Sequence, residues 1–298
     1  MVIYVPFVVD GYRKVTISLG GRCPIACRHC YTTAGQFVHG QESIPERILA
    51  ELRCVITPFD VICISGDTDC FLDPQAGLEL ITGAARGFPH ADVMFTSRLV
   101  PEDPVIAELS LLSDEMAERR RLLLPGISLV SMEVPNFSET SRRIPSALAR
   151  LRLIGRFAAA RMACLLALRP TFPFALVGRD DVRSMIRIAA GQASAVLGEV
   201  MLLDAGGQLA TRMEVPWSSI DDRYGRLTFL DQPSIWRKRS FTNETTFAAQ
   251  VCGEYRVPYF LRSGMALAFV RQHWDWQRGA LDPGARIVNG WSLDAPDP

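Results

Sequence analysis

The stretch KVTISLGGRCPIACRHC, residues 14–30, contains the pattern that decides the fold of this chain. Residues 14–19 alternate in polarity and are rich in β-branched side chains, which predicts a strand that ends at the glycine pair 20–21. Three cysteines follow at once with the spacing C-x-x-x-C-x-x-C, and they are Cys23, Cys27 and Cys30. The sequence therefore places three thiols in a loop directly after an early strand.

Outward from this loop, short apolar runs alternate with segments of helical period. The apolar runs predict further strands at 60–65, 92–97, 126–134, 161–168 and 198–203. The helical segments lie between them, at 44–52, 75–86, 104–112, 145–160 and 180–193. This alternation predicts an α/β fold with a parallel sheet and right-handed crossovers. Six such units suit a partial (β/α)6 barrel or an open doubly wound sheet, and both place the site at the carboxyl ends of the strands.

The pattern weakens beyond residue 205, which suggests a division into two parts. We expect residues 1–205 to form the barrel and residues 206–298 to form an aromatic and polar cap packed on it. The opening residues 1–14 are apolar but carry no cationic segment at their start, so they predict a strand instead of a signal peptide or a membrane span.

Composition excludes several classes of protein. The apolar fraction of 48% and the charged fraction of 21% are typical of a globular chain, which argues against disorder. The formal net charge is zero, so tight non-specific binding to nucleic acid or to an anionic membrane is not expected. Eight cysteines in a chain of 298 residues with no export signal predict free thiols in a reducing cytoplasm.

Three clustered thiols can serve a metal in two ways. A structural zinc site needs four protein ligands, usually in two pairs, and no second C-x-x-C occurs; the spacing of His39 fits no common zinc finger. A [4Fe–4S] cluster held by three cysteines keeps one iron open for a ligand. The triplet therefore favours a cluster that does chemistry, with zinc as the alternative.

The run CPIACRHC resembles the C-x-x-x-C-x-Φ-C motif of the radical S-adenosylmethionine (SAM) superfamily, at the position after a strand where that family carries it. The resemblance implies that Cys23, Cys27 and Cys30 hold a [4Fe–4S] cluster whose open iron binds SAM. It also implies reductive cleavage of SAM to a 5′-deoxyadenosyl radical, which abstracts a hydrogen atom from the substrate. His29 stands at the Φ position and would offer a flat face to adenine; an exposed loop histidine is the alternative.

The same resemblance assigns further cofactor contacts at the ends of later strands. Ser65, Gly66 and Asp67 stand where the superfamily binds the SAM amine, although Asp67 would serve equally as the N-cap of the next helix. Ser97 and Arg98 would contact the ribose or the carboxylate of SAM. Glu133 would bind ribose hydroxyls, with a plain surface position as the equal alternative.

Two more segments resemble the branch of the superfamily that contains spore photoproduct lyase. These are RRIPSALARLRLIGRF, residues 142–157, and LRPTFPF, residues 168–174. They offer Arg143 and Arg169 as clamps for the SAM carboxylate. The proline that this branch carries before the first arginine is replaced by Arg142, which weakens the assignment to the branch.

The substrate and the remaining thiols are less constrained. Cys70 and Cys252 are candidates for a catalytic thiol that donates hydrogen to a substrate radical, against a structural role for each. The neutral charge favours a small-molecule substrate in natural-product or cofactor biosynthesis, with flavodoxin or ferredoxin as electron donor. A nucleic-acid or peptide substrate is the first alternative, which the neutral charge makes unlikely, and a non-enzymatic iron–sulfur or zinc redox sensor is the second.

Overall fold

A single large sheet organises the molecule in the computed structural model, which describes residues 3–9, 11–64, 66–133, 138–214, 222–227 and 232–287. Its strand order is β1-β2-β3-β4-β5-β6-β7-β11. The bounds are β1 Ile3–Val9, β2 Tyr12–Ile17, β3 Val61–Ile64, β4 Asp92–Ser97, β5 Leu123–Leu129, β6 Leu165–Leu168, β7 Ala195–Gly198 and β11 Tyr259–Phe260. Strand β1 is antiparallel to β2, and every other neighbouring pair is parallel. The seven parallel strands curl into a partial barrel.

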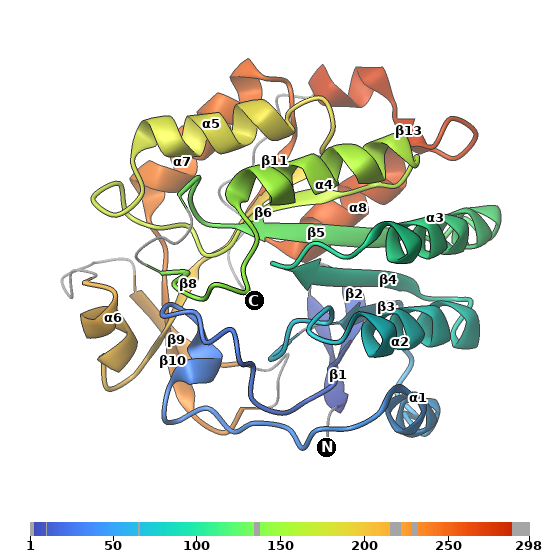
Figure 1. Ribbon diagram of the computed structural model, residues 1–298, viewed down its shortest axis with the longest axis horizontal. Helices are drawn as coiled ribbons and strands as arrows, with labels where there is room; N and C mark the ends of the chain where they lie inside the picture. Colours follow the sequence, from blue (N-terminus) through green and yellow to red (C-terminus); the bar gives the residue numbers. More distant parts are fainter. Residues whose placement is uncertain are drawn as a thin grey trace.

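The order of the strands decides between the two predicted architectures. A doubly wound sheet reverses direction part-way, whereas β2 to β7 follow one another in chain order. Five helices connect these strands and cover the outer face of the sheet (Figure 1): α1 Pro45–Arg53, α2 Pro74–Gly87, α3 Asp103–Glu118, α4 Ala147–Ala159 and α5 Arg179–Ala189. The predicted partial barrel is therefore confirmed.

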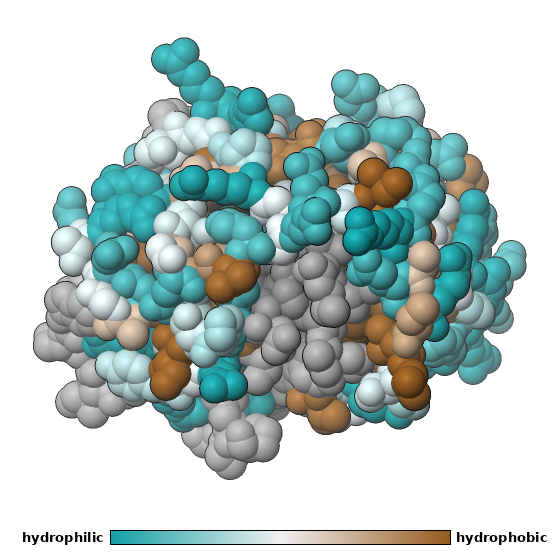
Figure 2. Space-filling view, turned by 90° about the horizontal axis from the view of Figure 1, so that it is seen from below, coloured by the Kyte–Doolittle hydropathy of each residue, from teal (hydrophilic) through white to brown (hydrophobic). Residues whose placement is uncertain are grey.

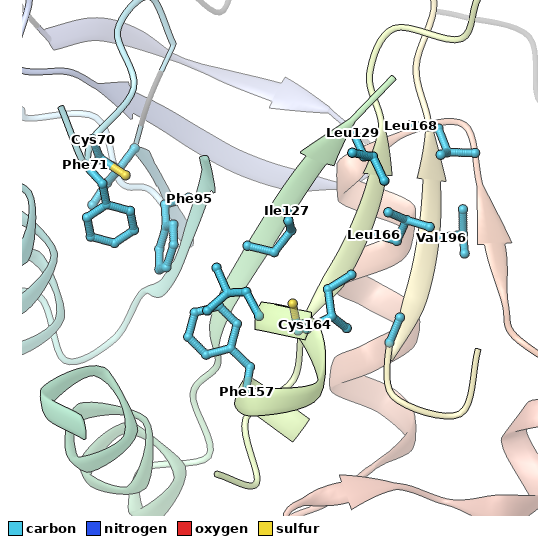
Figure 3. Packing of buried hydrophobic residues seen from close by; sticks show 14 of the residues in the cluster. Cys70, Phe71, Phe95, Ile127, Leu129, Phe157, Cys164, Leu166, Leu168 and Val196 are labelled. Atoms are coloured by element: carbon cyan, nitrogen blue, oxygen red, sulfur yellow. The ribbon is translucent and has the colours of Figure 1, made fainter. Parts of the chain in front are cut away.

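The core lies between the sheet and these helices. Apolar side chains of the strands, such as Ile62, Phe95 and Ile127, are at most 2% exposed and pack against helix residues such as Leu80 and Phe157. Figure 3 shows this layer, with Phe157 of α4 beneath Ile127 of β5. Burial on this face explains why the strands read as nearly continuous apolar runs.

Three predicted strands differ from those observed by three residues or more. Strand β6 begins at Leu165, four residues after the expected start at 161. Strand β5 begins three residues earlier than the expected start at 126 and ends at Leu129, five residues before the expected end. The strand expected at 198–203 is divided into β7 and β8 (Met201–Asp204), which belong to different sheets. Glu199 lies at the division, where it turns its carboxylate to Arg169 instead of continuing the ladder.

The last third of the described chain contributes a strand to the barrel. Strand β11 pairs with β7 and extends the main sheet. Strands β8, β9 (Asp222–Arg226) and β10 (Ile235–Arg239) form a separate sheet. The other elements are η1 Tyr31–Thr33, α6 Gln208–Arg212, α7 Thr242–Glu254, α8 Ser263–His273, β12 Trp274–Asp275, β13 Ala280–Leu281 and η3 Pro283–Ile287. Residues 206–298 therefore include a strand of the barrel, and the boundary at 205 remains a prediction.

Helix α8 closes the barrel at the end opposite the site. Its residues Ala266, Leu267 and Val270 pack with Val61 and Leu124 on the inner side of the sheet. Lys14 donates to Ser263 at 3.0 Å, and Arg271 pairs with the buried Asp92 at 2.9 Å. These contacts close one end of the barrel, so access to its interior is left to the carboxyl ends of the strands.

The surface is predominantly polar on the face seen from below Figure 1. In Figure 2 the hydrophobic residues of the described chain form small separate groups on that face. None of the helices that the structure describes is long and apolar enough to cross a membrane.

Candidate active site

A pocket opens at the carboxyl ends of the parallel strands, with the three-cysteine loop forming one wall. The space among its lining residues is about 850 Å3, which includes the part open to solvent. Its lining combines sulfur, carboxylate and guanidinium groups: Cys23, Cys27, His29, Cys30, Gly66, Asp67, Asp69, Arg98, Arg169 and Glu199 are among its residues. Segments from five strand ends, those of β2, β3, β4, β6 and β7, therefore converge on one concave site.

Short-range hydrogen bonds shape the cysteine loop. The Cys30 amide donates to the carbonyl of Cys27 at 3.0 Å, and the Thr33 amide donates to the carbonyl of Cys30 at 3.0 Å. Ala26 adopts a left-handed φ of 49°, which turns the chain between the first two cysteines. The loop is anchored from outside where the Arg28 amide donates to the carbonyl of Ser138 at 2.9 Å. The result is a tight turn that brings all three sulfur atoms to the pocket wall.

The three thiols share a largely apolar base and influence one another. Burial raises the pKa of Cys23, and the charge of the neighbouring Cys30 raises it further. Burial raises the pKa of Cys27 to about 12, although the Arg98 guanidinium acts in the opposite direction. A bound cation would favour the thiolate forms, because thiolates are the metal-binding species.

The donor set distinguishes a cluster from a single metal ion. Within the described ranges, no three His, Cys, Asp or Glu side chains are gathered so that they could hold one metal ion. A tetrahedral zinc site needs that convergence, whereas a [4Fe–4S] cluster takes each cysteine on a different iron. Three reduced thiols on one loop, beside a pocket with room for a further ligand, fit the cluster.

A buried ion network stands behind the loop. Glu139, which is fully buried, accepts from Arg98 Nε at 3.1 Å and from Arg150 Nη2 at 2.6 Å. Arg150 is also fully buried and donates to the carbonyl of Ser128 at 2.8 Å. The network positions Arg98 of the β4 end, whose Nη2 lies 2.9 Å from His29 Nε2.

His29 differs from the exposed, flat platform that was expected. Its side chain is buried, and it makes an edge contact with the Phe172 ring at a centroid distance of 5.5 Å. Burial, with Arg98 and Arg150 nearby, holds its pKa well below the ordinary value, so the ring is neutral. The alternative of an exposed loop histidine is wrong, while contact with adenine remains a prediction.

The segment after β3 contributes carboxylates to the pocket. Asp67 is buried at the pocket wall and accepts from the Ser18 hydroxyl. It is not the N-cap of the next helix, because Asp73 caps α2 by accepting from the amides of Gln75 and Ala76. Asp67 therefore lines the site, and its contact with the SAM amine remains a prediction.

Ser97 has a different neighbour from the one expected. It is 1% exposed, and its hydroxyl donates to Asp69 at 2.8 Å, while the amide of Arg98 donates to the same carboxylate at 2.7 Å. Ser97 is therefore a support for Asp69, which itself lines the pocket. Burial raises the pKa of Asp69 despite these hydrogen bonds.

The strands on the far side of the pocket supply an ion pair. Arg169 follows β6, and its Nε lies 2.7 Å from the carboxylate of Glu199, which follows β7. Both side chains are about one quarter exposed, so they remain accessible from the pocket.

Some predicted site residues lie elsewhere. Glu133 and Arg143 are exposed and are not part of the described pocket lining. The Arg143 segment contributes the buried neighbour Ile144 to the base of the cysteine loop instead. Ser65 lies outside the described residues.

The two candidate catalytic thiols are core residues. Cys70 is 2% exposed and lies beside Phe71 and Phe95 in the packed layer (Figure 3). Cys252 is fully buried in α7, where burial raises its pKa. Neither contributes to the described pocket lining, so the geometry favours the structural alternative for both.

The structure adds residues that sequence reasoning did not select. Glu139, Arg150 and Glu199 carry no motif, and only their contacts with Arg98 and Arg169 mark them. Cys63 is only partly buried, and the charges of Lys14, Arg169 and Glu199 act on its pKa, which burial raises. Strand alternation was a usable signal, since Ile62 and Ile64 face the helices while Cys63 faces the barrel interior.

Comparison with solved structures identifies one recurrent neighbour for this architecture. A double mutant of spore photoproduct lyase, with bound AdoMet and dinucleoside spore photoproduct, superposes with a TM-score of 0.59 over 86% of this chain and 78% of that chain. The chain shares its fold with spore photoproduct lyase. Sequence identity is 13% for this structure, and 14% for a single mutant that superposes with a TM-score of 0.58 over 85% of this chain and 77% of that chain.

The likeness confirms the predicted fold resemblance. Another spore photoproduct lyase structure, complexed with dinucleoside spore photoproduct, has a TM-score of 0.59 at 13% identity, over 85% of this chain and 77% of that chain. No protein-family model and no curated protein sequence matches the chain. The chemistry of this chain must therefore be argued from its own residues.

Proposed function

We propose that this protein is a radical SAM enzyme, with a [4Fe–4S] cluster on Cys23, Cys27 and Cys30 and SAM in the adjoining pocket. The observation that carries the proposal is the meeting of the three-cysteine loop with Asp67, Arg169 and Glu199 in one pocket at the carboxyl ends of the strands. A redox sensor would need the thiols but would have no use for this set of charged groups beside them.

The cluster, when bound and reduced, supplies the electron that cleaves SAM to methionine and a 5′-deoxyadenosyl radical. The protein binds and orients SAM. Asp67 accepts from the ammonium group, and Arg169 faces the carboxylate. Glu199 takes the role of ribose acceptor that was expected of Glu133, because Glu199 lines the pocket and Glu133 does not. Closure of the opposite end by α8 keeps water from reaching the reactive carbon through the barrel.

A thiol that quenches a substrate radical must be reachable from the pocket. None of Cys63, Cys70 and Cys252 belongs to the described pocket lining, but Cys63 is the partly exposed one, it faces the barrel interior, and the pocket residues Arg169 and Glu199 act on its pKa. We therefore assign any hydrogen-donating role to Cys63.

Two substrate classes fit the site. The neutral net charge supports a small molecule from natural-product or cofactor biosynthesis. The structural neighbours hold a dinucleoside spore photoproduct, which supports a nucleic-acid substrate as the second candidate. Arg28 and Arg212 lie next to the cysteine loop, where Arg212 Nη1 donates to Thr33 at 3.1 Å, so a phosphate could find a cation there.

The first test is anaerobic reconstitution with iron and sulfide, followed by addition of SAM and dithionite and an assay for 5′-deoxyadenosine. We expect iron–sulfur absorbance and 5′-deoxyadenosine in the wild type. Cys27→Ala should abolish both, whereas Cys54→Ala, at the exposed C-cap of α1, should leave both unchanged. Bound zinc without a cluster, or 5′-deoxyadenosine formation that survives Cys27→Ala, would overturn the proposal.

The second test separates the substrate classes. Dinucleoside spore photoproduct and a short oligonucleotide are titrated against the SAM-bound protein at two salt concentrations. A nucleic-acid enzyme should bind the oligonucleotide with an affinity that falls steeply with salt. Absence of binding by both probes supports the small-molecule class, and flavodoxin and ferredoxin can then be compared as electron donors in a substrate screen.

A further inference from the structure

The imidazole of His29 is buried in the wall of the pocket with only one of its nitrogens satisfied. The side chain is 5% exposed, and Nε2 lies 2.9 Å from Arg98 Nη2. Nδ1 is shielded from solvent, and no hydrogen-bond partner for it exists among the residues that the structure describes. His29 stands between Cys27 and Cys30 and lines the same pocket as all three cysteines.

The contact with Arg98 decides which nitrogen carries the proton. A guanidinium group has N–H donors and no acceptor, so His29 Nε2 must accept. A neutral ring then carries its proton on Nδ1. The unsatisfied atom is therefore a donor, Nδ1–H.

Arg98 cannot easily release this hydrogen bond. Its Nε donates to the fully buried Glu139 at 3.1 Å, and its Nη2 also donates to the carbonyl of Arg169 at 3.0 Å. Glu139 is held in turn by Arg150 at 2.6 Å. These contacts hold the guanidinium in place, and the guanidinium in turn orients the ring of His29.

A buried donor without an acceptor costs about 1–3 kcal/mol, which is why such groups usually have a partner. The edge contact with Phe172, at an interplanar angle of 85°, leaves the ring enclosed and not laid open as a stacking surface. The missing acceptor is thus expected in whatever the pocket binds.

We propose that His29 donates a hydrogen bond from Nδ1 to a sulfur of the cluster held by Cys23, Cys27 and Cys30, and that Arg98 and Glu139 position it for this role. The inference rests on the proposed function, since it needs the cluster. A hydrogen bond to a cluster sulfur stabilises the more negative, reduced state and therefore raises the reduction potential. His29 is a tuning residue in this view, not an adenine platform.

The first experiment uses the protein without a cluster. Long-range 15N–1H correlation spectra of the apoprotein, with His29 assigned by comparison with His29→Asn, report which ring nitrogen is protonated. We expect the Nδ1–H tautomer. The Nε2–H tautomer, or rapid exchange between the two, would overturn the inference whether or not the protein binds a cluster.

The second experiment measures the midpoint potential of the reconstituted cluster in the absence of SAM. His29→Phe removes the donor and should lower the potential, with His29→Leu as a substitute if the Phe variant takes up no iron. His29→Asn keeps an N–H close to the Nδ1 position and should retain most of the wild-type value. His39→Phe is the matched control, because His39 Nδ1 is also buried without a partner but is not part of the described pocket lining.

The outcomes separate the two proposals. A wild-type protein that assembles no iron–sulfur cluster overturns the proposed function. A cluster whose potential is the same in the wild type and the His29→Phe and His29→Leu variants overturns the inference alone. If those variants weaken SAM binding while the potential stays constant, the donor serves SAM and the inference is likewise overturned.

Discussion

At the scale of single residues, the molecule buries a carboxylate between two guanidinium groups next to its site. Glu139 and Arg150 have side chains with no exposed surface, and Arg98 is 19% exposed. Charges taken out of water in this way are stable only while each has its partners. Their burial therefore makes the network a sensitive point of the fold, unlike the pairs on the surface.

Glu139→Ala should lower the free energy of unfolding by about 3–5 kcal/mol, because it leaves two cations with no buried counter-charge. The measurement is urea denaturation followed by circular dichroism. Glu115→Ala is the matched control, since Glu115 lies 2.6 Å from Arg86 in an exposed pair, and this substitution should lower the free energy of unfolding far less. Equal effects of the two substitutions would contradict the assigned role of burial.

The thiols provide a second prediction at this scale. Brief alkylation of the folded apoprotein, read by mass spectrometry, should label Cys54 first because it is exposed. Cys164 and Cys252 should stay unlabelled until the protein unfolds, since each is fully buried and burial raises its pKa. Early labelling of Cys252 would restore it as a candidate catalytic thiol.

At the scale of elements, most helices and strands could be predicted because their signals are local. Strand β4 has the bounds that the pattern of residues 92–97 predicts. The start of α1 shows the limit of such signals. Ser43 is of a residue type favoured as an N-cap, but the N-cap is Ile44, with no side-chain hydrogen bond, and the Ser43 hydroxyl is buried without a partner in the described chain.

The helix that follows the pocket residue Asp67 has a true side-chain cap. Asp73 accepts from the amides of Gln75 at 3.1 Å and Ala76 at 3.0 Å. Asp73→Ala should therefore cost about 1 kcal/mol of stability in urea denaturation. Glu102→Ala, at the N-cap of α3 where no side-chain cap exists, should have a smaller effect. A larger loss at Glu102 would refute the assignment of the cap.

At the scale of the whole molecule, the C-terminal part of the described chain is tied into the barrel at one tight contact. A Cβ placed on Gly198, the last residue of β7, would lie 2.1 Å from the hydroxyl oxygen of Tyr259 in β11. Tyr259 is 2% exposed, so its ring has little room to move. A glycine is therefore needed where β11 joins the sheet.

Gly198→Ala should destabilise the protein by about 1–3 kcal/mol through overpacking. It should also increase proteolytic cleavage after residue 204, because the pairing of β11 with β7 is weakened. Gly253→Ala in α7 is the control, since its new methyl group meets nothing within 4 Å and should be neutral or stabilising. Unchanged stability of Gly198→Ala would show that the two parts are joined elsewhere.

The sequence by itself determined the alternating α/β pattern and the three-cysteine loop at the end of β2. These follow from periodicity and spacing over a few residues, so no distant contact is needed to see them. It also placed Asp67, Arg98 and Arg169 at strand ends, which a parallel sheet necessarily brings to one edge.

Only the tertiary structure decided which charged groups meet there. Arg98 pairs with Glu139, which is 41 residues away in the sequence, and Lys14 donates to Ser263, which is 249 residues away. No pattern in the neighbouring sequence indicates either pairing. For the same reason, the sequence did not indicate that Cys252 lies in the core or that Glu199 lines the site. The partners of these side chains depend on where each strand end lies in the sheet. That position is determined by the packing of the whole chain.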